Sequence, residues 1–357
     1  MADLLMARAQ VRLPDPLATI QALEAHFAGH ATVRTTGEGA VVEAPQFGRL
    51  TLRAHGETFI VACESPNALA LGFLKMVTAE GFVRHAPSGC GPLVWTGDGT
   101  DGGLPFFRAM EVVASYPVTR RMRRVILRGD AGHFTGPGLH VRVLIPPRGR
   151  RPVWPHAGVD GRIVFPEGAD ALVPRVYTVR AVDTVAGTIA IDAVLHEGDC
   201  PGATWAREAA PGDAVGLLGP GGARPEPGSW NLFAGDETAL PAIARLLEAL
   251  PAQSVAVVRI EVADAAEQQV LATPARLDLR YLPRDGRPAG RAGLLPAAIR
   301  DLAFPVDLAT ARAFVGCEQA EAREIRSFLT KEAGFDKAHR MVAAYWRLGH
   351  AGVDIGD

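Results

Sequence analysis

The stretch Arg175-Val-Tyr-Thr-Val-Arg180 alternates like a β-strand and, with the segment after it, decides the fold of the middle of this chain. Arg175 and Tyr177 share one face of that strand, and Thr178 lies on the other. A further strand leads into His196-Glu-Gly-Asp-Cys-Pro-Gly-Ala-Thr-Trp-Ala206, where Pro and Gly precede a short helix. An aromatic face, a hydroxyl, basic side chains and N–H groups at a helix start suit a flavin nucleotide on a small β-barrel. We therefore expect Tyr177 against the flavin ring and Thr178 near its reactive nitrogen.

The same six residues are also typical of an ordinary barrel strand with an exposed arginine and a β-favouring Tyr-Thr pair. The second element, about twenty residues later, favours the flavin, because Arg175, Arg180 and the Gly202–Trp205 turn then all serve one pyrophosphate. His196 has two open interpretations. It is either a histidine in a turn or a contact at the adenine or pyrophosphate end of the nucleotide.

The chain as a whole has the composition of a globular protein, with 357 residues, 48% hydrophobic, 21% charged and a net charge of −2. Its length predicts two or three domains, and its near-neutral charge argues against nucleic-acid binding. No apolar run of about 18 residues predicts a membrane span, and no export signal is visible, so we expect a cytoplasmic protein. The four cysteines and ten histidines are dispersed without a zinc or iron–sulfur pattern, so we expect no metal ligands.

Residues 1–97 predict a separate α+β domain. Asp15-Pro16 begins one helix and Ser65-Pro66 a second, with alternating strand patterns between them. No catalytic group of residues is visible here, so packing or assembly is the plainest role and a ligand site is the alternative. The glycine-rich segment 98–104 is the linker after this domain.

Residues 105–226 predict a closed antiparallel β-barrel, because short strand patterns succeed one another without intervening helices. The expected strands are Phe107–Tyr116, Met122–Arg128, His140–Ile145, Arg162–Val164, the strand beginning at Arg175, Ile189–Leu195 and Ala214–Leu218. The Gly219-Pro220-Gly221-Gly222 segment is not a dinucleotide fingerprint and fits a turn leaving the barrel.

Residues 227–357 alternate strands with helices, which predicts a parallel sheet covered on its faces. The expected strands are Trp230–Ala234, Ser254–Val262, Leu277–Leu282 and Ala311–Val315. Such sheets bind nucleotides at the carboxyl ends of their strands. The predicted fold class is therefore a multidomain protein: an α+β module, then a barrel and an α/β nucleotide-binding sheet in the ferredoxin-reductase layout.

Two features at the start of this last domain bear on a nicotinamide nucleotide. The Asp236-Glu-Thr-Ala-Leu-Pro241 turn leads into a helix, whose N-terminus would meet the nucleotide's phosphates, although the turn itself is acidic. Glu261, at the end of the next strand, could accept a ribose hydroxyl, which would favour the unphosphorylated nucleotide.

These features together resemble the siderophore-interacting protein family, flavin-dependent reductases of ferric siderophores. The matching segments are Arg175–Arg180, His196–Ala206, Pro211-Gly-Asp213, Gly219-Pro220, Asp236–Pro241 and Tyr345-Trp-Arg347-x-Gly349, within about residues 105–350. The first hundred residues resemble an uncharacterised domain that accompanies some members and brings no function with it.

The resemblance implies a cofactor, a reaction and the residues that serve them. FAD would bind across the barrel, and a hydride from NAD(P)H, or electrons from a ferredoxin-type donor, would reduce it. Single electrons would then pass to chelated Fe(III), which a siderophore holds far more weakly once it is reduced. The implied cofactor-binding residues are Arg175, Tyr177, Thr178, Val179, His196, Gly202, Ala203, Thr204 and Trp205, with Asp236, Glu237 and Thr238 on the donor side.

Many ferric siderophores are anionic, and the family's substrate pocket is basic. Arg142 and Arg347 are the candidates here, with ordinary surface arginine as the alternative. Arg142 stands where lysine is expected, and the two differ in geometry. Two further departures concern the flavin: Ala203 replaces a serine, with Thr204 adjacent as a substitute, and Cys200 takes a glycine position.

The sequence thus predicts a cytoplasmic FAD-dependent enzyme that reduces ferric siderophores or other ferric chelates. Two alternatives are open. One is a general NAD(P)H:flavin or quinone reductase on the same scaffold. The other is a non-enzymatic siderophore-binding protein with a decayed flavin site, supported only by the changes at Cys200 and Ala203.

Overall fold

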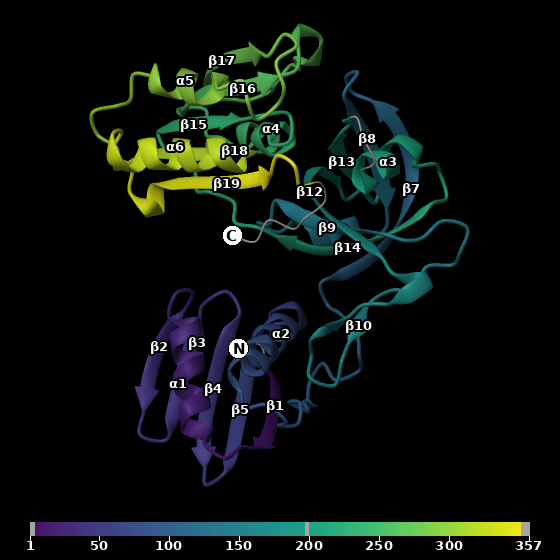
Figure 1. Ribbon diagram of the computed structural model, residues 1–357, viewed down its shortest axis with the longest axis vertical. Coiled ribbons are helices and arrows are strands. Elements are labelled where there is room, and N and C mark those ends of the chain that lie inside the picture. The colour runs from purple at the N-terminus through teal and green to yellow at the C-terminus, as the bar shows by residue number, and fades with distance from the viewer. Residues whose placement is uncertain (1–3, 197–199, 351–357) are drawn as a thin grey trace. The chain divides into compact units, whose positions relative to one another are not determined.

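The structure is a computed structural model that describes residues 4–196 and 200–350. The chain divides into two compact units, which are described separately (Figure 1). The first is Met1–Phe107 together with Pro147–Leu172, and the second is Arg108–Pro146 together with Val173–Asp357. Among the described residues, no helix is long and apolar enough to cross a membrane.

The first unit is built on a six-stranded antiparallel sheet of order β2-β3-β4-β5-β1-β6. Its strands are β1 (Leu5–Arg12), β2 (Thr32–Thr36), β3 (Gly39–Ala44), β4 (Gly48–His55), β5 (Thr58–Ser65) and β6 (Thr96–Gly97). Helices α1 (Pro16–Phe27) and α2 (Ala68–His85) pack against each other and against the sheet, enclosing an apolar core. The predicted α+β module is therefore present.

The sequence predicted the start of α1 correctly and the start of α2 incorrectly. Asp15 caps α1 as expected, accepting the N–H of Ala18 at 3.0 Å. The expectation that Ser65-Pro66 opens α2 is wrong by two residues. Ser65 ends β5 and donates its hydroxyl to the Phe47 carbonyl at 2.7 Å, and Asn67 is the cap.

Residues 147–172 belong to the first unit although they lie between two barrel strands in sequence. They contain β10 (His156–Ala157), β11 (Ile163–Val164) and a short 3₁₀ turn, Gly168–Asp170. Trp95 Nε1 donates to the Asp160 carbonyl at 2.6 Å and fixes this segment to the sheet domain. The prediction that Arg162–Val164 is a barrel strand is wrong, because β11 pairs only with β10 in a two-stranded hairpin.

The second unit begins with the predicted closed antiparallel barrel, of order β12-β13-β8-β7-β14-β9. Its strands are β7 (Phe107–Pro117), β8 (Met122–Arg128), β9 (His140–Ile145), β12 (Val173–Asp183), β13 (Thr188–Val194) and β14 (Ala214–Gly221). Alternate residues of these strands fill its core, and helix α3 (Pro201–Glu208) packs on β8 and β13. A 3₁₀ turn, Ala131–Thr135, also contacts the barrel.

The barrel is followed by a five-stranded parallel sheet of order β17-β16-β15-β18-β19. Its strands are β15 (Trp230–Gly235), β16 (Val255–Val262), β17 (Arg276–Pro283), β18 (Ala311–Glu318) and β19 (Arg340–Trp346). Helix α4 (Leu240–Glu248) contributes to the core on one face, and α5 (Leu294–Arg300) and α6 (Gln319–Lys331) contribute to the core on the other. Two 3₁₀ turns, Ala265–Glu267 and Lys337–His339, complete the domain. The strand order reverses between β15 and β18, where such sheets bind nucleotides.

Candidate flavin and donor site

The start of α3 lies directly on the strand that carries the opening motif. A Cβ at Gly202 would lie 2.4 Å from Tyr177 Oη and 3.4 Å from Arg175 Cγ, so only glycine fits there. The rings of Tyr177 and Trp205 are 5.8 Å apart between centroids. The structure thus brings together Arg175, Tyr177, Gly202 and Trp205, four residues that the sequence grouped by spacing alone.

This cluster fits an anionic group in two respects. Arg175 Nε is buried and has no hydrogen-bond partner among the described residues, while its Nη1 donates to the Pro174 carbonyl at 2.6 Å. The N-cap of α3, Cys200, makes no side-chain capping bond, so the first N–H groups of the helix are not capped by a side chain. A pyrophosphate would satisfy both an orphaned guanidinium nitrogen and a helix N-terminus. Thr204 is partly exposed in the same turn, whereas Ala203 is buried.

The neighbouring residues of β12 are held firmly. Thr178 is buried and pairs in register with His140 of β9. The carbonyl of Val179 accepts a hydrogen bond of 3.0 Å from Arg245 of α4. Arg180, expected to supply charge for the pyrophosphate, instead makes a two-pronged ion pair with Glu248 at 2.7 and 3.2 Å. These contacts join the barrel to the α/β domain through the same strand that carries Tyr177.

A second junction links β9 to the C-terminal strand. His140 Nε2 and Tyr345 Oη lie 2.9 Å apart, and the two rings meet edge to face. Burial lowers the pKa of His140 and raises that of Tyr345, so both side chains are neutral near pH 7. Next to them, Trp346 Nε1 donates to Asp236 Oδ2 at 2.7 Å. The Tyr-Trp pair near the C-terminus therefore makes specific polar contacts in addition to packing.

The candidate substrate arginines lie on or directly after these same strands. Arg142 is partly exposed on β9, two residues beyond His140 and in register with Val176 and Leu218. Arg347 follows β19 and is exposed. Contact of either arginine with a substrate stays a prediction. The same holds for His196, which is exposed beyond the end of β13.

The acidic turn Asp236–Pro241 lies where the strand order reverses, and its charged side chains make contacts within the protein. Asp236 is buried, and its Oδ1 accepts the N–H of Thr238 at 2.9 Å. Glu237 makes an ion pair with Arg284 at 2.6 Å, and Glu261 Oε1 accepts from the same guanidinium at 3.2 Å. Burial raises the pKa of Asp236 and of Glu261. The side chains of Asp236 and Glu237 are thus occupied, and the backbone N–H groups of Asp236, Thr238 and Ala239 also donate within the protein.

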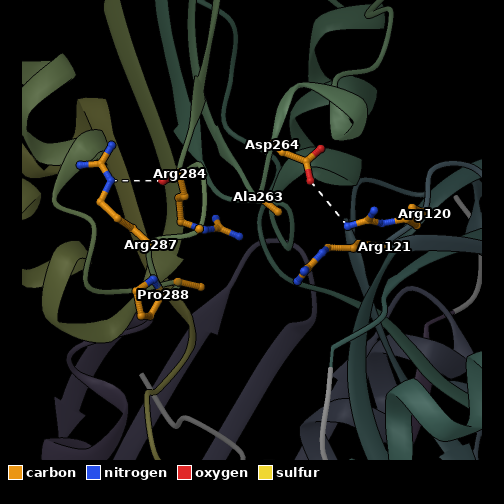
Figure 2. A pocket seen from close by; sticks show the side chains of 9 residues that line it. Arg120, Arg121, Ala263, Asp264, Arg284, Arg287 and Pro288 are labelled. Carbon is orange, nitrogen blue, oxygen red and sulfur yellow. Dashed lines mark hydrogen bonds and ion pairs between the residues drawn. The ribbon is translucent and has the colours of Figure 1, made fainter.

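Four arginines that the sequence interpretation missed border a pocket of about 420 Å³ near this edge. Arg120 and Arg121 come from the β7–β8 turn, and Arg284 and Arg287 follow β17 (Figure 2). The available signals were an Arg-Arg pair in a hairpin turn and two arginines just past a strand end. Neither signal alone says that the two segments meet.

Comparison with known proteins places this geometry in a family. Residues 228–349 match the family model described as siderophore-interacting protein, and residues 111–224 match the siderophore-interacting FAD-binding domain. The chain belongs to the siderophore-interacting protein family. The predicted resemblance is confirmed, and the barrel is the family's FAD-binding domain. Residues 8–96 match an uncharacterized protein conserved in bacteria, DUF2218.

Individual relatives agree with this assignment. The chain is 31% identical over 247 residues to the ferric vibriobactin reductase ViuB of Vibrio cholerae, covering 68% of this chain and 90% of ViuB. A siderophore utilization protein from T. fusca has a similar structure, with a TM-score of 0.57 and 31% identity over 70% of this chain and 95% of that one. The siderophore-interacting protein SipS from Aeromonas hydrophila gives a TM-score of 0.58 and 26% identity over 68% and 92%. Each of these matches covers about two thirds of this chain.

Proposed function

We propose that this protein is an FAD-dependent oxidoreductase that reduces ferric siderophores and so releases Fe(II), with NAD(P)H or another donor reducing the flavin. The observation that carries the proposal is the cluster at the start of α3. There Gly202 allows the start of α3 to lie directly against Tyr177, and Arg175 keeps a buried Nε without a partner among the described residues. The similarity to a ferric vibriobactin reductase supports the choice of reaction. A cytoplasmic location and a ferredoxin-type partner belong to the same proposal.

The residues on the flavin side bind and orient the cofactor. Arg175 and the N–H groups of the α3 start hold the pyrophosphate, and Tyr177 packs against the ring. Thr178 presents its hydroxyl near the reactive nitrogen. When bound, the flavin accepts two electrons from a donor and passes them on singly. Because Thr178 is buried, its hydroxyl is shielded from bulk water.

The residues on the substrate side position the chelate. Arg142 and Arg347 attract an anionic ferric siderophore, whose iron remains held by the siderophore until it is reduced. His140 and Tyr345, hydrogen-bonded at 2.9 Å, keep β9 and β19 in a fixed relation; Arg142 lies on β9, and Arg347 directly follows β19. Because the pair is neutral near pH 7, it adds no charge that would repel the chelate.

An anaerobic absorbance titration tests the proposal: NAD(P)H is added to the purified protein, and then a ferric siderophore. We expect a yellow protein that bleaches and recovers its oxidised spectrum as Fe(II) appears. A flavin that bleaches and then ignores the chelate would instead indicate a general flavin or quinone reductase. A colourless protein that still binds the ferric siderophore after FAD is supplied would indicate a binding protein.

A further inference from the structure

The pocket of about 420 Å³ beside the parallel sheet, here called the arginine pocket, is lined by Arg120, Arg121, Asp264, Arg284 and Arg287 with four small or apolar neighbours. It opens where β16 and β17 end, on the edge at which such sheets bind nucleotides. Its volume suits part of a nucleotide, since small-ligand sites measure about 300–1,000 Å³. No part of the flavin cluster lines it.

The four guanidinium groups differ in how far their charge is already balanced. Arg284, whose side chain is 6% exposed, is held by Glu237 and Glu261. Arg120 lies 3.7 Å from Asp264, a loose and exposed pair. In the described part of the chain no carboxylate pairs with the guanidinium of Arg121 or Arg287. Arg287 uses only its Nε, which donates to the Arg284 carbonyl at 3.2 Å. Arg121 and Arg287 therefore supply uncompensated positive charge.

The turn that carries Arg121 is fixed without the use of its side chain. Glu267, which is 2% exposed, accepts the backbone N–H of Arg121 at 3.1 and 3.2 Å and also the hydroxyl of Thr119. In Figure 2 the side chains of Arg121 and Arg284 point into the arginine pocket from opposite sides. The pocket is thus composite, with one wall from the barrel hairpin and one from the sheet, and it is organised before a ligand arrives.

We propose that the arginine pocket binds a phosphate group of the donor nucleotide, an inference that rests on the proposed function. Guanidinium groups match phosphate oxygens in charge and geometry. The turn at Asp236 is acidic and its side chains are occupied, so the positive charge at this sheet edge comes from the arginines instead. The carboxylate of Glu261, expected to accept a ribose hydroxyl, instead bonds Arg284.

Direct binding to the intact flavoprotein tests this without any turnover. Pyrophosphate, 5′-ADP and adenosine 2′,5′-bisphosphate are titrated into the wild type and into Arg121→Gln and Arg287→Gln. Arg128→Gln is the matched control, an exposed arginine at the far end of the same strand β8. We expect each pocket variant to weaken the affinity for adenosine 2′,5′-bisphosphate about tenfold or more, the loss typical of a charge-assisted hydrogen bond. The control should leave it unchanged.

The probes separate the two phosphate sources. If the pocket variants bind only the bisphosphate more weakly, the pocket holds a 2′-phosphate. If they bind pyrophosphate and 5′-ADP more weakly to the same extent, the pocket holds the diphosphate. Equal affinities in Arg121→Gln and Arg128→Gln, with flavin content and unfolding temperature unchanged, would overturn the inference. So would a wild type that binds none of the probes.

A chemical reductant separates this inference from the proposed function. Dithionite reduces the flavin without a nucleotide, after which a ferric siderophore is added. A protein that then reduces the chelate but binds none of the probes keeps its proposed function and loses only the arginine pocket. Arg121→Gln could instead bind a reduced acidic electron-transfer protein more weakly and bind the nucleotide probes as the wild type does. That result would also contradict a phosphate site in the arginine pocket.

Discussion

Arg175 on the flavin side and Arg284 on the donor side meet negative charge in opposite ways. At the start of α3, Arg175 keeps a buried nitrogen without a partner in the described residues, and Gly202 lets the helix start lie against Tyr177. At the sheet edge, the whole side chain of Arg284 is buried, and two glutamates already satisfy it. An arginine left unsatisfied marks a place for a ligand, whereas one that is fully paired belongs to the scaffold.

The largest effect should come from breaking the paired arginine. Arg284→Met leaves Glu237 and Glu261 buried without their counter-charge, and the loss of one partner from a buried ion pair costs about 3–5 kcal/mol. Chemical denaturation of the variant measures this. The exposed pair of Arg300 and Glu324 is the control, and Arg300→Met should cost about 0–1 kcal/mol. Similar losses of stability in the two variants would show that the buried ion pairs of Arg284 contribute no more than the exposed pair of Arg300.

The next effect should appear on the flavin side. In Gly202→Val, the Cβ alone would lie 2.4 Å from Tyr177 Oη, so β12 and α3 must separate. We expect the protein to lose most of its FAD during purification and to bind added FAD at least tenfold more weakly, since overpacking costs about 1–3 kcal/mol. Gly136→Ala is the control because a Cβ there meets nothing within 4 Å. Normal flavin content in Gly202→Val would show that the close contact of Gly202 with Tyr177 is not part of the flavin site.

These two sites also differ in how far the sequence could predict them. The contact of Tyr177 with Gly202 joins two local motifs whose spacing is itself informative, so the sequence grouped them correctly. The arginine pocket joins Arg121 to Arg284 across two domains, and no local pattern records which strand ends meet. The His140–Tyr345 bond, 205 residues apart in sequence, is equally invisible to periodicity.

The fold shows the same division between local and distant information. Barrel strands and the strand–helix alternation follow from side-chain periodicity, so the barrel and the parallel sheet were predictable. Ile163–Val164 was misplaced in the barrel because a two-residue strand carries almost no periodicity of its own. Its partner, β10, and its anchor, the bond from Trp95 to the Asp160 carbonyl, decide where it lies. Such tertiary contacts override a short strand pattern.

A smaller, pH-dependent effect should come from Glu321, in the first turn of α6. Burial raises its pKa from 4.5 to about 7, so the folded state favours the protonated acid. Its contribution to stability is therefore present below pH 4.5 and is lost as the pH rises through about 7. Glu321→Gln mimics the protonated form and should exceed the wild type in stability above pH 7, by on the order of 1–3 kcal/mol.

Denaturation curves at several pH values check this prediction, with attention to the difference between the two proteins. The difference should shrink towards zero as the pH falls below about 4.5, where the wild-type side chain becomes protonated in both states. Taking the difference also cancels the contribution of His140, whose lowered pKa acts in the opposite direction. A gap that stays constant with pH would mean that Glu321 does not titrate in this range.

The smallest effect should come from the junction between β9 and β19. Tyr345→Phe keeps the ring that packs beside Gly316 and removes only the hydroxyl that meets His140 at 2.9 Å. The net loss should be about 1 kcal/mol, measured by denaturation. His140→Phe should cost a similar amount, and the double variant little more than either alone, because both changes remove one shared bond. Fully additive losses would show that the two side chains act independently.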